Sequence, residues 1–153
     1  MQRQARAIWR GSIKEGKGDV STLSGALKNI PYSFQTRFEN QPGSNPEELI
    51  AAAHASCFAM ATSAALSKQG FEPESLDVTA TVSLQKDKDT WTVGSSHLHL
   101  KAHVTNVTQG QFQEIAEDAK KNCPISRLLN AEITLQADLE EASSRPWAPP
   151  PPV

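Results

Sequence analysis

The chain contains very few cysteines, only Cys57 and Cys123 among its 153 residues. Two thiols cannot complete a usual zinc site, and their spacing is not the Cys-x-x-Cys of thioredoxin-like proteins. In a reducing compartment such thiols are more often catalytic, sensing or metal-binding than a permanent disulfide. An unpaired cysteine is also commonly an inert, buried small residue, so the cysteine count alone leaves both interpretations open.

The sequence also lacks a basic cluster. Its formal net charge is -2, its pI is about 6.1, and its lysines and arginines are scattered, which argues against nucleic-acid binding. The first residues, Met1 to Ala7, show no apolar stretch of a secretory signal, and we expect no apolar run near the roughly 18 residues that span a bilayer. These absences predict a soluble, cytoplasmic protein without nucleic-acid or membrane partners.

The length suits one domain that buries about two-thirds of its unfolded surface. We expect a single domain over residues 1–139 and a proline-rich tail over residues 140–153, which contains Pro146 and a run of four prolines at 149–152. The composition of this tail is typical of a polyproline-type extension.

The pattern of turn residues predicts the first elements. Glycines divide the segment from Ala5 to Ile30 into short strand-like stretches, which suggests a small antiparallel meander. After a loop containing Pro31 and Pro42-Gly43, Asn45 is a good helix N-cap, Pro46 fits the first helical position, and Glu48 falls where a capping box requires it. A helix is therefore predicted from Pro46 to about Lys68.

This predicted helix is apolar or small nearly all round between Leu49 and Leu66, unlike the one-sided stripe of a surface helix. We expect it to be buried on most sides. Because one chain offers too little sheet to wrap it, we also expect a second copy to complete the core.

Alternating apolar residues predict three later strands. Two flank a turn at residues 86–89, and the last runs over residues 131–139. Between them, Phe112, Ile115, Ala116 and Ala119 predict a helix that Cys123-Pro124 interrupts, with a short second helix to about Leu129. The predicted order of elements is strands, one helix, strands, two helices and a final strand. This order favours an α+β fold over a regular βαβ winding.

Three segments carry a resemblance to a known family. They are Thr36-Arg37-Phe38-Glu39, the run from Asn45 to Phe58, and Asn122-Cys123-Pro124-Ile125-Ser126 followed by residues 131–135. With these segments the chain resembles the osmotically inducible protein C (OsmC) family and its organic hydroperoxide resistance relatives. The resemblance extends from about Arg6 to Leu139 and is closer to the OsmC branch.

This resemblance implies antiparallel sheets wrapped around long central helices in an intertwined homodimer, with two active sites at the subunit interface. It also implies thiol-dependent reduction of organic hydroperoxides, and more weakly of hydrogen peroxide. Cys57 matches the attacking thiol, Cys123 the resolving thiol, and Arg37 and Glu47 the charged pair beside them. Such a cycle requires a dithiol reductant and no metal, flavin or haem.

Residue chemistry alone favours the other cysteine as nucleophile. Cys123 is expected at a helix N-terminus, where the helix dipole favours a thiolate, whereas apolar surroundings in mid-helix would raise the pKa of Cys57. A nucleophilic Cys57 would need a cation, for which Arg37 is the candidate, held by Glu47. Without the resemblance, Arg37 would be interpreted as a solvated loop charge, and Glu47 as a first-turn residue that complements the dipole.

Several alternatives remain open on sequence alone. His97, His99 and His103 share one strand face and could bind metal, although a polar solvent face explains them fully. His54, one turn before Cys57, is interpreted as a packing or interface residue rather than a catalytic base. The protein could instead be a redox-sensing dimer that binds a hydrophobic ligand, or a structural dimer with inert cysteines.

Overall fold

The computed structural model describes residues 1–140. The chain forms two compact units, one from Met1 to Ile50 and one from Ala51 onward. The expectation of one domain over residues 1–139 therefore stays a prediction. The tail expected over residues 140–153 lies, beyond Glu140, outside the described residues.

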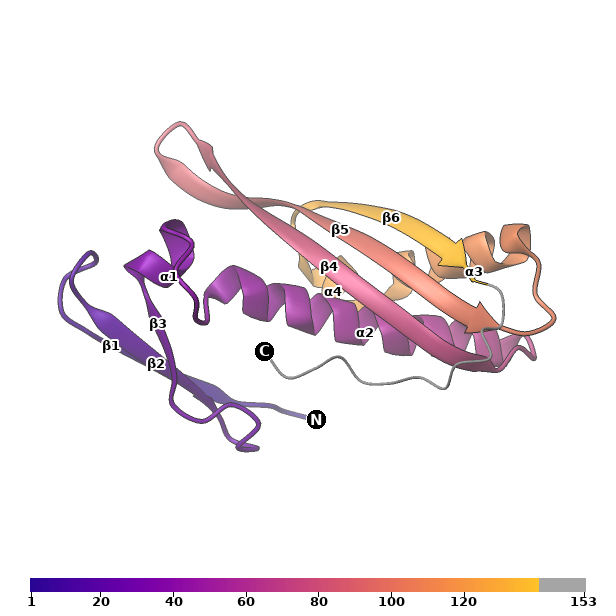
Figure 1. Cartoon of the computed structure of the whole chain (residues 1–153), viewed down its shortest axis with the longest axis horizontal. Coiled ribbons are helices and arrows are strands. Elements are labelled where there is room, and N and C mark those ends of the chain that lie inside the picture. Colours follow the sequence, from indigo (N-terminus) through magenta and orange to yellow (C-terminus); the bar gives the residue numbers. More distant parts are fainter. Residues whose placement is uncertain (141–153) are drawn as a thin grey trace. The chain divides into compact units, whose positions relative to one another are not determined.

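The first unit contains a three-stranded antiparallel sheet in the order β1-β2-β3 (Figure 1). Its strands are β1 (Ala5–Arg10), β2 (Lys17–Thr22) and β3 (Ile30–Ser33). A Cβ at Gly18 would lie 2.5 Å from the Tyr32 ring, so only glycine lets that ring cover β2. The ring centroids of Tyr32 and Trp9 are 5.5 Å apart. The predicted antiparallel meander is confirmed, although its third strand begins at Ile30 and includes Pro31, where the sequence predicted a loop.

A short helix, α1 (Phe34–Phe38), follows β3 where the sequence predicted a loop. The Ser33 hydroxyl accepts a hydrogen bond from the Thr36 N–H at 3.2 Å, and the Thr36 hydroxyl accepts one from the Ser33 N–H at 2.9 Å. This reciprocal capping box provides acceptors for two backbone N–H groups at the start of α1. Five residues are too few to produce a helical periodicity, which is why the pattern did not reveal α1.

Helix α2 (Pro46–Lys68) has the ends that the sequence predicts. At its start, the Asn45 side chain accepts a hydrogen bond from the Glu48 N–H at 2.9 Å. At its end, Gly70 adopts a φ of 84°, and the Phe71 N–H bonds the Leu66 carbonyl at 3.0 Å. This left-handed termination satisfies carbonyls that the helix leaves free, and glycine adopts it without strain.

Only one stripe of α2 is buried. His54, Phe58, Thr62 and Leu66 lie one turn apart and are fully enclosed, whereas the Met60 side chain is 75% exposed. The expectation that α2 is buried on most sides is therefore wrong for the single chain, because one sheet covers only one stripe of a helix. A second copy that covers the remaining faces stays a prediction.

Helix α2 also corrects the expectation about apolar runs. By length and composition alone it could cross a membrane, because its many alanines outweigh its few polar residues. The core helix of a water-soluble protein meets the same criteria, so length and composition alone do not identify α2 as a membrane-spanning helix. Its buried polar residues, His54 and Thr62, form hydrogen bonds within the chain.

The second unit contains a mixed sheet in the order β4-β5-β6. Strands β4 (Pro73–Asp87) and β5 (Thr90–Val104) form a long antiparallel hairpin, as predicted. Strand β6 (Glu132–Leu139), however, is parallel to β5, which corrects the expectation of antiparallel sheets. The chain crosses through two helices between β5 and β6, and such a crossover returns the next strand in the same direction.

Those helices are α3 (Gln109–Asn122) and α4 (Pro124–Leu128). Figure 1 shows α2 running alongside β4 and β5, and the core of this unit joins the sheet to α2 and α3. Each fully buried large apolar side chain contributes about 1.5–3 kcal/mol. The largest fully buried apolar side chains are Phe58, Leu66, Leu98, Leu100 and Phe112.

Candidate active site

The two cysteines, far apart in sequence, pack in the same core cluster, and the Cys123 side chain raises the pKa of Cys57. Both are free thiols. Cys57 lies on α2 and is half-buried, whereas Cys123 is completely buried at the junction where α3 ends and α4 begins. The structure thus brings together an accessible thiol and an enclosed one, both within the second unit.

The start of α4 acts on Cys57. Pro124, the first helical residue, has no N–H, and the Cys123 side chain forms no cap hydrogen bond. The next backbone donor, the Ile125 N–H, bonds the Cys57 sulfur. Sequence reasoning placed the helix N-terminus correctly but did not predict its effect on Cys57, because that effect depends on how α4 packs near α2.

Burial nevertheless raises the pKa of Cys57 above its usual value, and the hydrogen bond and charge interaction with Cys123 raise it further. The Ile125 N–H lowers the pKa and offsets part of this rise. Within the second unit, Cys57 is therefore a thiol that needs additional positive charge to ionise near neutral pH.

His54, one turn before Cys57, is fully buried. Its Nδ1 is 2.8 Å from the Ser96 hydroxyl on β5, and its Nε2 is 2.8 Å from the Ser126 hydroxyl on α4. Burial lowers the pKa of His54. Because both ring nitrogens are occupied, His54 is not placed to act as a base toward Cys57, in agreement with its interpretation as a packing residue.

In the first unit, Arg37 on α1 pairs with Glu47 on α2, as the family resemblance implies. The shortest contact joins Arg37 Nη2 to Glu47 Oε1 at 2.7 Å, and Arg37 Nε lies 3.1 Å from Glu47 Oε2. Two parallel contacts of this kind fix the plane of the guanidinium. Its carbon atom also lies 5.1 Å from the centroid of the Phe38 ring, so the guanidinium is orientated by two neighbours.

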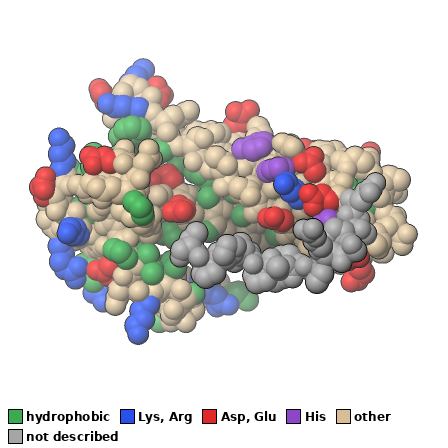
Figure 2. All heavy atoms as spheres, viewed as in Figure 1, with side chains coloured by type: hydrophobic (Ala, Val, Ile, Leu, Met, Phe, Trp, Pro, Cys, Tyr) green, Lys and Arg blue, Asp and Glu red, His purple; other side chains and the backbone are tan. Residues whose placement is uncertain are grey.

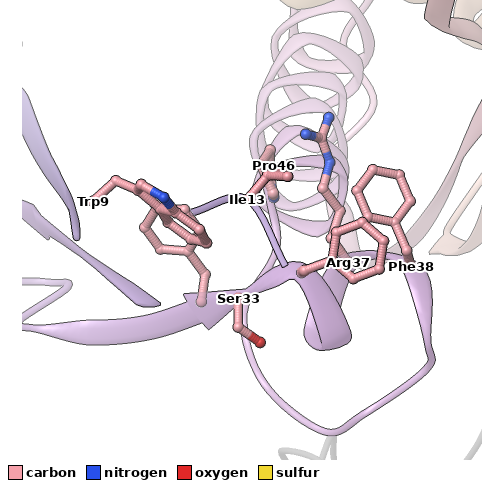
Figure 3. Close-up of a pocket in the computed structure, with 8 residues that line it drawn as sticks. Trp9, Ile13, Ser33, Arg37, Phe38 and Pro46 are labelled. Atoms are coloured by element: carbon pink, nitrogen blue, oxygen red, sulfur yellow. The ribbon is translucent and has the colours of Figure 1, made fainter. Parts of the chain in front are cut away.

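A pocket of about 220 Å³ adjoins Arg37 in the first unit. Figure 3 shows Trp9 on one side and Arg37 with Phe38 on the other, with Ile13 and Pro46 between them. The lining is mostly aromatic and aliphatic, so the pocket suits a hydrocarbon group with one polar end. The sequence did not predict this pocket, because its residues come from β1, the β1–β2 turn, β3, α1 and the start of α2.

The three histidines of β5 lie on its polar face, and Figure 2 shows histidines among acidic side chains. Their contacts are His97 with Thr134 at 2.7 Å, His99 with Asp138 at 2.9 Å, and His103 with Glu140 at 3.0 Å. The hydrogen bond from His99 lowers the pKa of Asp138. Within residues 1–140, no group of three or more histidine, cysteine or acidic residues is placed to hold a metal ion. These contacts support the interpretation of the three histidines as part of a polar surface of β5.

Sequence reasoning missed three groups that contact Cys57 or its neighbour His54: the Ile125 N–H, Ser96 and Ser126. Ser126 belongs to the segment after Cys123 and could have been suspected from its place. Ser96 carries no comparable signal, because only the pairing of distant elements brings it to His54.

Comparison with known proteins matches this chain to one family. The family described as OsmC-like protein matches residues 38–138. Peroxiredoxin OsmC of Escherichia coli strain K12 is 46% identical over 140 residues, covering 92% of this chain and 98% of that protein. The organic hydroperoxide resistance protein OhrB of Bacillus subtilis is 29% identical over 125 residues, covering 80% of this chain and 89% of that protein.

Solved structures agree with these sequence matches. The crystal structure of Bacillus subtilis OhrB has a TM-score of 0.66 at 25% identity and covers 90% of this chain and 98% of its own. An OsmC-like protein of Vibrio cholerae has a TM-score of 0.71 at 19% identity and covers 90% and 99%, which shows the shared fold. With an α+β fold of this kind and a family match over most of its length, the chain belongs to the OsmC-like family.

Proposed function

We propose that this protein is a thiol-dependent peroxidase that reduces organic hydroperoxides through Cys57 and Cys123. The observation that carries the proposal is the contact between a half-buried thiol and a fully buried one beside a backbone donor. The names of its relatives, a peroxiredoxin and organic hydroperoxide resistance proteins, support the peroxidase class.

In the proposed cycle, the Cys57 thiolate attacks one peroxide oxygen and the O–O bond breaks. The other oxygen leaves as an alkoxide that takes up a proton, and Cys57 becomes a sulfenic acid. Cys123 then attacks the Cys57 sulfur, hydroxide leaves and takes up the Cys123 proton as water, and a disulfide remains. A dithiol reductant of two electrons restores both thiols.

Arg37 is proposed to act mainly on the transition state. Lowering a thiol pKa from about 8.5 to about 6 increases the thiolate at pH 7 about 30-fold. The less basic thiolate, however, loses about 13-fold in intrinsic reactivity. Ionisation alone therefore supplies a factor of about two or three, and positioning of the peroxide and stabilisation of the alkoxide must supply the rest.

The proposed site combines residues of two subunits. Glu47 and Cys57 are ten positions apart on one helix, which corresponds to about 15 Å of rise. An arginine held by Glu47 is therefore proposed to serve Cys57 of a second copy. The exposed face of α2 around Met60 is the surface on which that copy is proposed to pack.

Substrate preference is the first test of the proposed function. With a dithiol donor, we expect kcat/KM for cumene hydroperoxide to exceed that for hydrogen peroxide by about ten-fold or more, because the apolar pocket binds the hydrocarbon part. Ile13 lines that pocket and is 66% exposed, so Ile13→Ser should fold normally. It should lower the rate with cumene hydroperoxide more than the rate with hydrogen peroxide.

A redox-sensing dimer that binds a hydrophobic ligand is the second candidate function. The pocket lined by aromatic residues favours it, because such a lining suits an apolar ligand. Steady-state peroxide consumption separates the two candidates. A sensor would be oxidised once per subunit and would not turn over in the presence of excess dithiol.

The oligomeric state is a second test. We expect wild-type protein to have twice the 16.6 kDa mass of one chain in light scattering, and Met60→Asp to shift it toward monomer by placing a charge on the predicted interface. Thr79→Asp, on an exposed position of β4, is the matched control. Wild-type protein that is monomeric at micromolar concentration would contradict the two-subunit site.

A further inference from the structure

One buried polar group of the second unit has no place in the proposed cycle. The His54 side chain is fully enclosed, and each of its ring nitrogens is 2.8 Å from a serine hydroxyl. A buried polar side chain is costly unless its hydrogen bonds are satisfied, and an apolar residue would fill the same space without that requirement. Because both ring nitrogens of His54 have hydrogen-bond partners, the residue is expected to have a specific structural role.

The two hydroxyls belong to different elements. Ser96 lies on β5, within the core sheet, and Ser126 lies on α4, a helix of only five residues. His54 itself lies on α2. The imidazole thus joins the short helix to both large elements of the unit through a single side chain.

The position of α4 matters for both thiols. Ser126 directly follows Ile125, whose N–H bonds Cys57, and α4 begins immediately after Cys123. A small shift of α4 would therefore withdraw the backbone donor from Cys57 and move the Cys123 sulfur at the same time.

We infer that His54 is a positioning residue that holds α4 against α2 through Ser126. This link keeps the Ile125 N–H and the Cys123 thiol next to the Cys57 sulfur. The inference rests on the proposed roles of the two cysteines only for its importance in the peroxidase cycle. The placement of α4 can be measured without any peroxide.

The neutral imidazole is sufficient for this task. One ring nitrogen donates to one hydroxyl, and the other accepts from the second hydroxyl. Burial lowers the pKa of His54, which favours the neutral ring. No proton has to move through His54 during the reaction.

The first test replaces Ser126 by alanine, which cuts the link to α4 and leaves His54 bonded to Ser96. We expect the pKa of Cys57, measured from the pH dependence of alkylation in a Cys123→Ser background, to rise by about half a unit to one unit. The reason is that the Ile125 N–H no longer stabilises the thiolate. Ser126→Thr keeps the hydroxyl and should restore the pKa.

The second test follows closure of the disulfide with 5,5′-dithiobis(2-nitrobenzoate). Cys57 first forms a mixed disulfide with thionitrobenzoate. Cys123 then attacks the Cys57 sulfur, the mixed disulfide breaks, and a coloured thionitrobenzoate anion leaves. We expect Ser126→Ala to slow this second release about five-fold or more, because the two sulfurs are no longer held together.

Thr62→Val is the matched control for both tests. Thr62 is fully buried on the same stripe of α2, and its hydroxyl donates only within the helix, to the Phe58 carbonyl at 2.9 Å. The control removes a buried hydroxyl without touching α4 and should alter neither the Cys57 pKa nor the closure rate.

An unchanged Cys57 pKa and an unchanged closure rate in Ser126→Ala would overturn the inference. Equal slowing in Thr62→Val would overturn it as well, because general loosening of the core would then explain both. Loss of peroxidase turnover plays no part in either measurement. Failure of the proposed function, seen as peroxide reduction that survives Cys57→Ser, is therefore distinguishable from failure of this inference.

Discussion

Replacement of Cys57 by serine is expected to lower peroxide reduction to the rate of the dithiol alone. The hydroxyl of serine does not ionise near neutral pH and cannot form the sulfenic acid on which the proposed cycle depends. Steady-state consumption of cumene hydroperoxide with excess dithiol measures this loss. The variant should remain folded, because serine has the same branching as cysteine and Cys57 is only half-buried.

The matched variant, Cys123→Ser, separates attack from resolution. It is expected to consume one equivalent of peroxide per subunit and to leave a sulfenic acid on Cys57 that a dimedone-type probe labels. If the probe instead labels Cys123 in the Cys57→Ser protein as fast, the assignment of roles is wrong. Cys123 is fully buried, so slow labelling there is expected on grounds of access as well.

The second large effect is expected for Arg37→Lys. Lysine keeps the charge but loses the planar fork that makes two contacts with Glu47. We expect the single-turnover rate with peroxide to fall more than about ten-fold while the pKa of Cys57 moves by less than about one unit. The rate comes from rapid-mixing oxidation, and the pKa from the pH dependence of alkylation.

Arg10→Lys is the control for this prediction. Arg10 forms an ion pair with Asp19 at 3.1 Å in the same unit, and its side chain is 67% exposed, so the same chemical change should have little effect there. If the rate of Arg37→Lys falls only in step with its thiolate fraction, Arg37 merely ionises Cys57. The transition-state role would then have to be abandoned.

Much of the fold could be predicted from the sequence because its signals are local. Asn45, Pro46 and Gly70 mark the ends of α2, and Cys123-Pro124 marks the break between α3 and α4. The direction of β6 could not be predicted in this way. It depends on how the chain crosses between β5 and β6, which no residue pattern within β6 records.

The site shows the same division between local and non-local information. The pairing of Arg37 with Glu47 was implied by the family resemblance, and the capping position of Glu48 left Glu47 free for it. The bond from the Ile125 N–H to Cys57 did not, because it requires α4 to face a helix that lies far away in sequence. The cytoplasmic location and the catalytic roles of these residues stay predictions.

The main chain of Cys123 is hydrogen-bonded to both α3 and α4. Its N–H bonds the Ala119 carbonyl at 2.8 Å, and its carbonyl accepts from the Arg127 N–H at 3.0 Å. On oxidation, the Cys123 sulfur would therefore move by rotation about its side-chain bonds, while the backbone hydrogen bonds of α3 and α4 remain intact. A dithiol arriving from solvent would meet Cys57 as the reachable end of the disulfide. The regenerating mixed disulfide would form on Cys57, and Cys123 would be the leaving group.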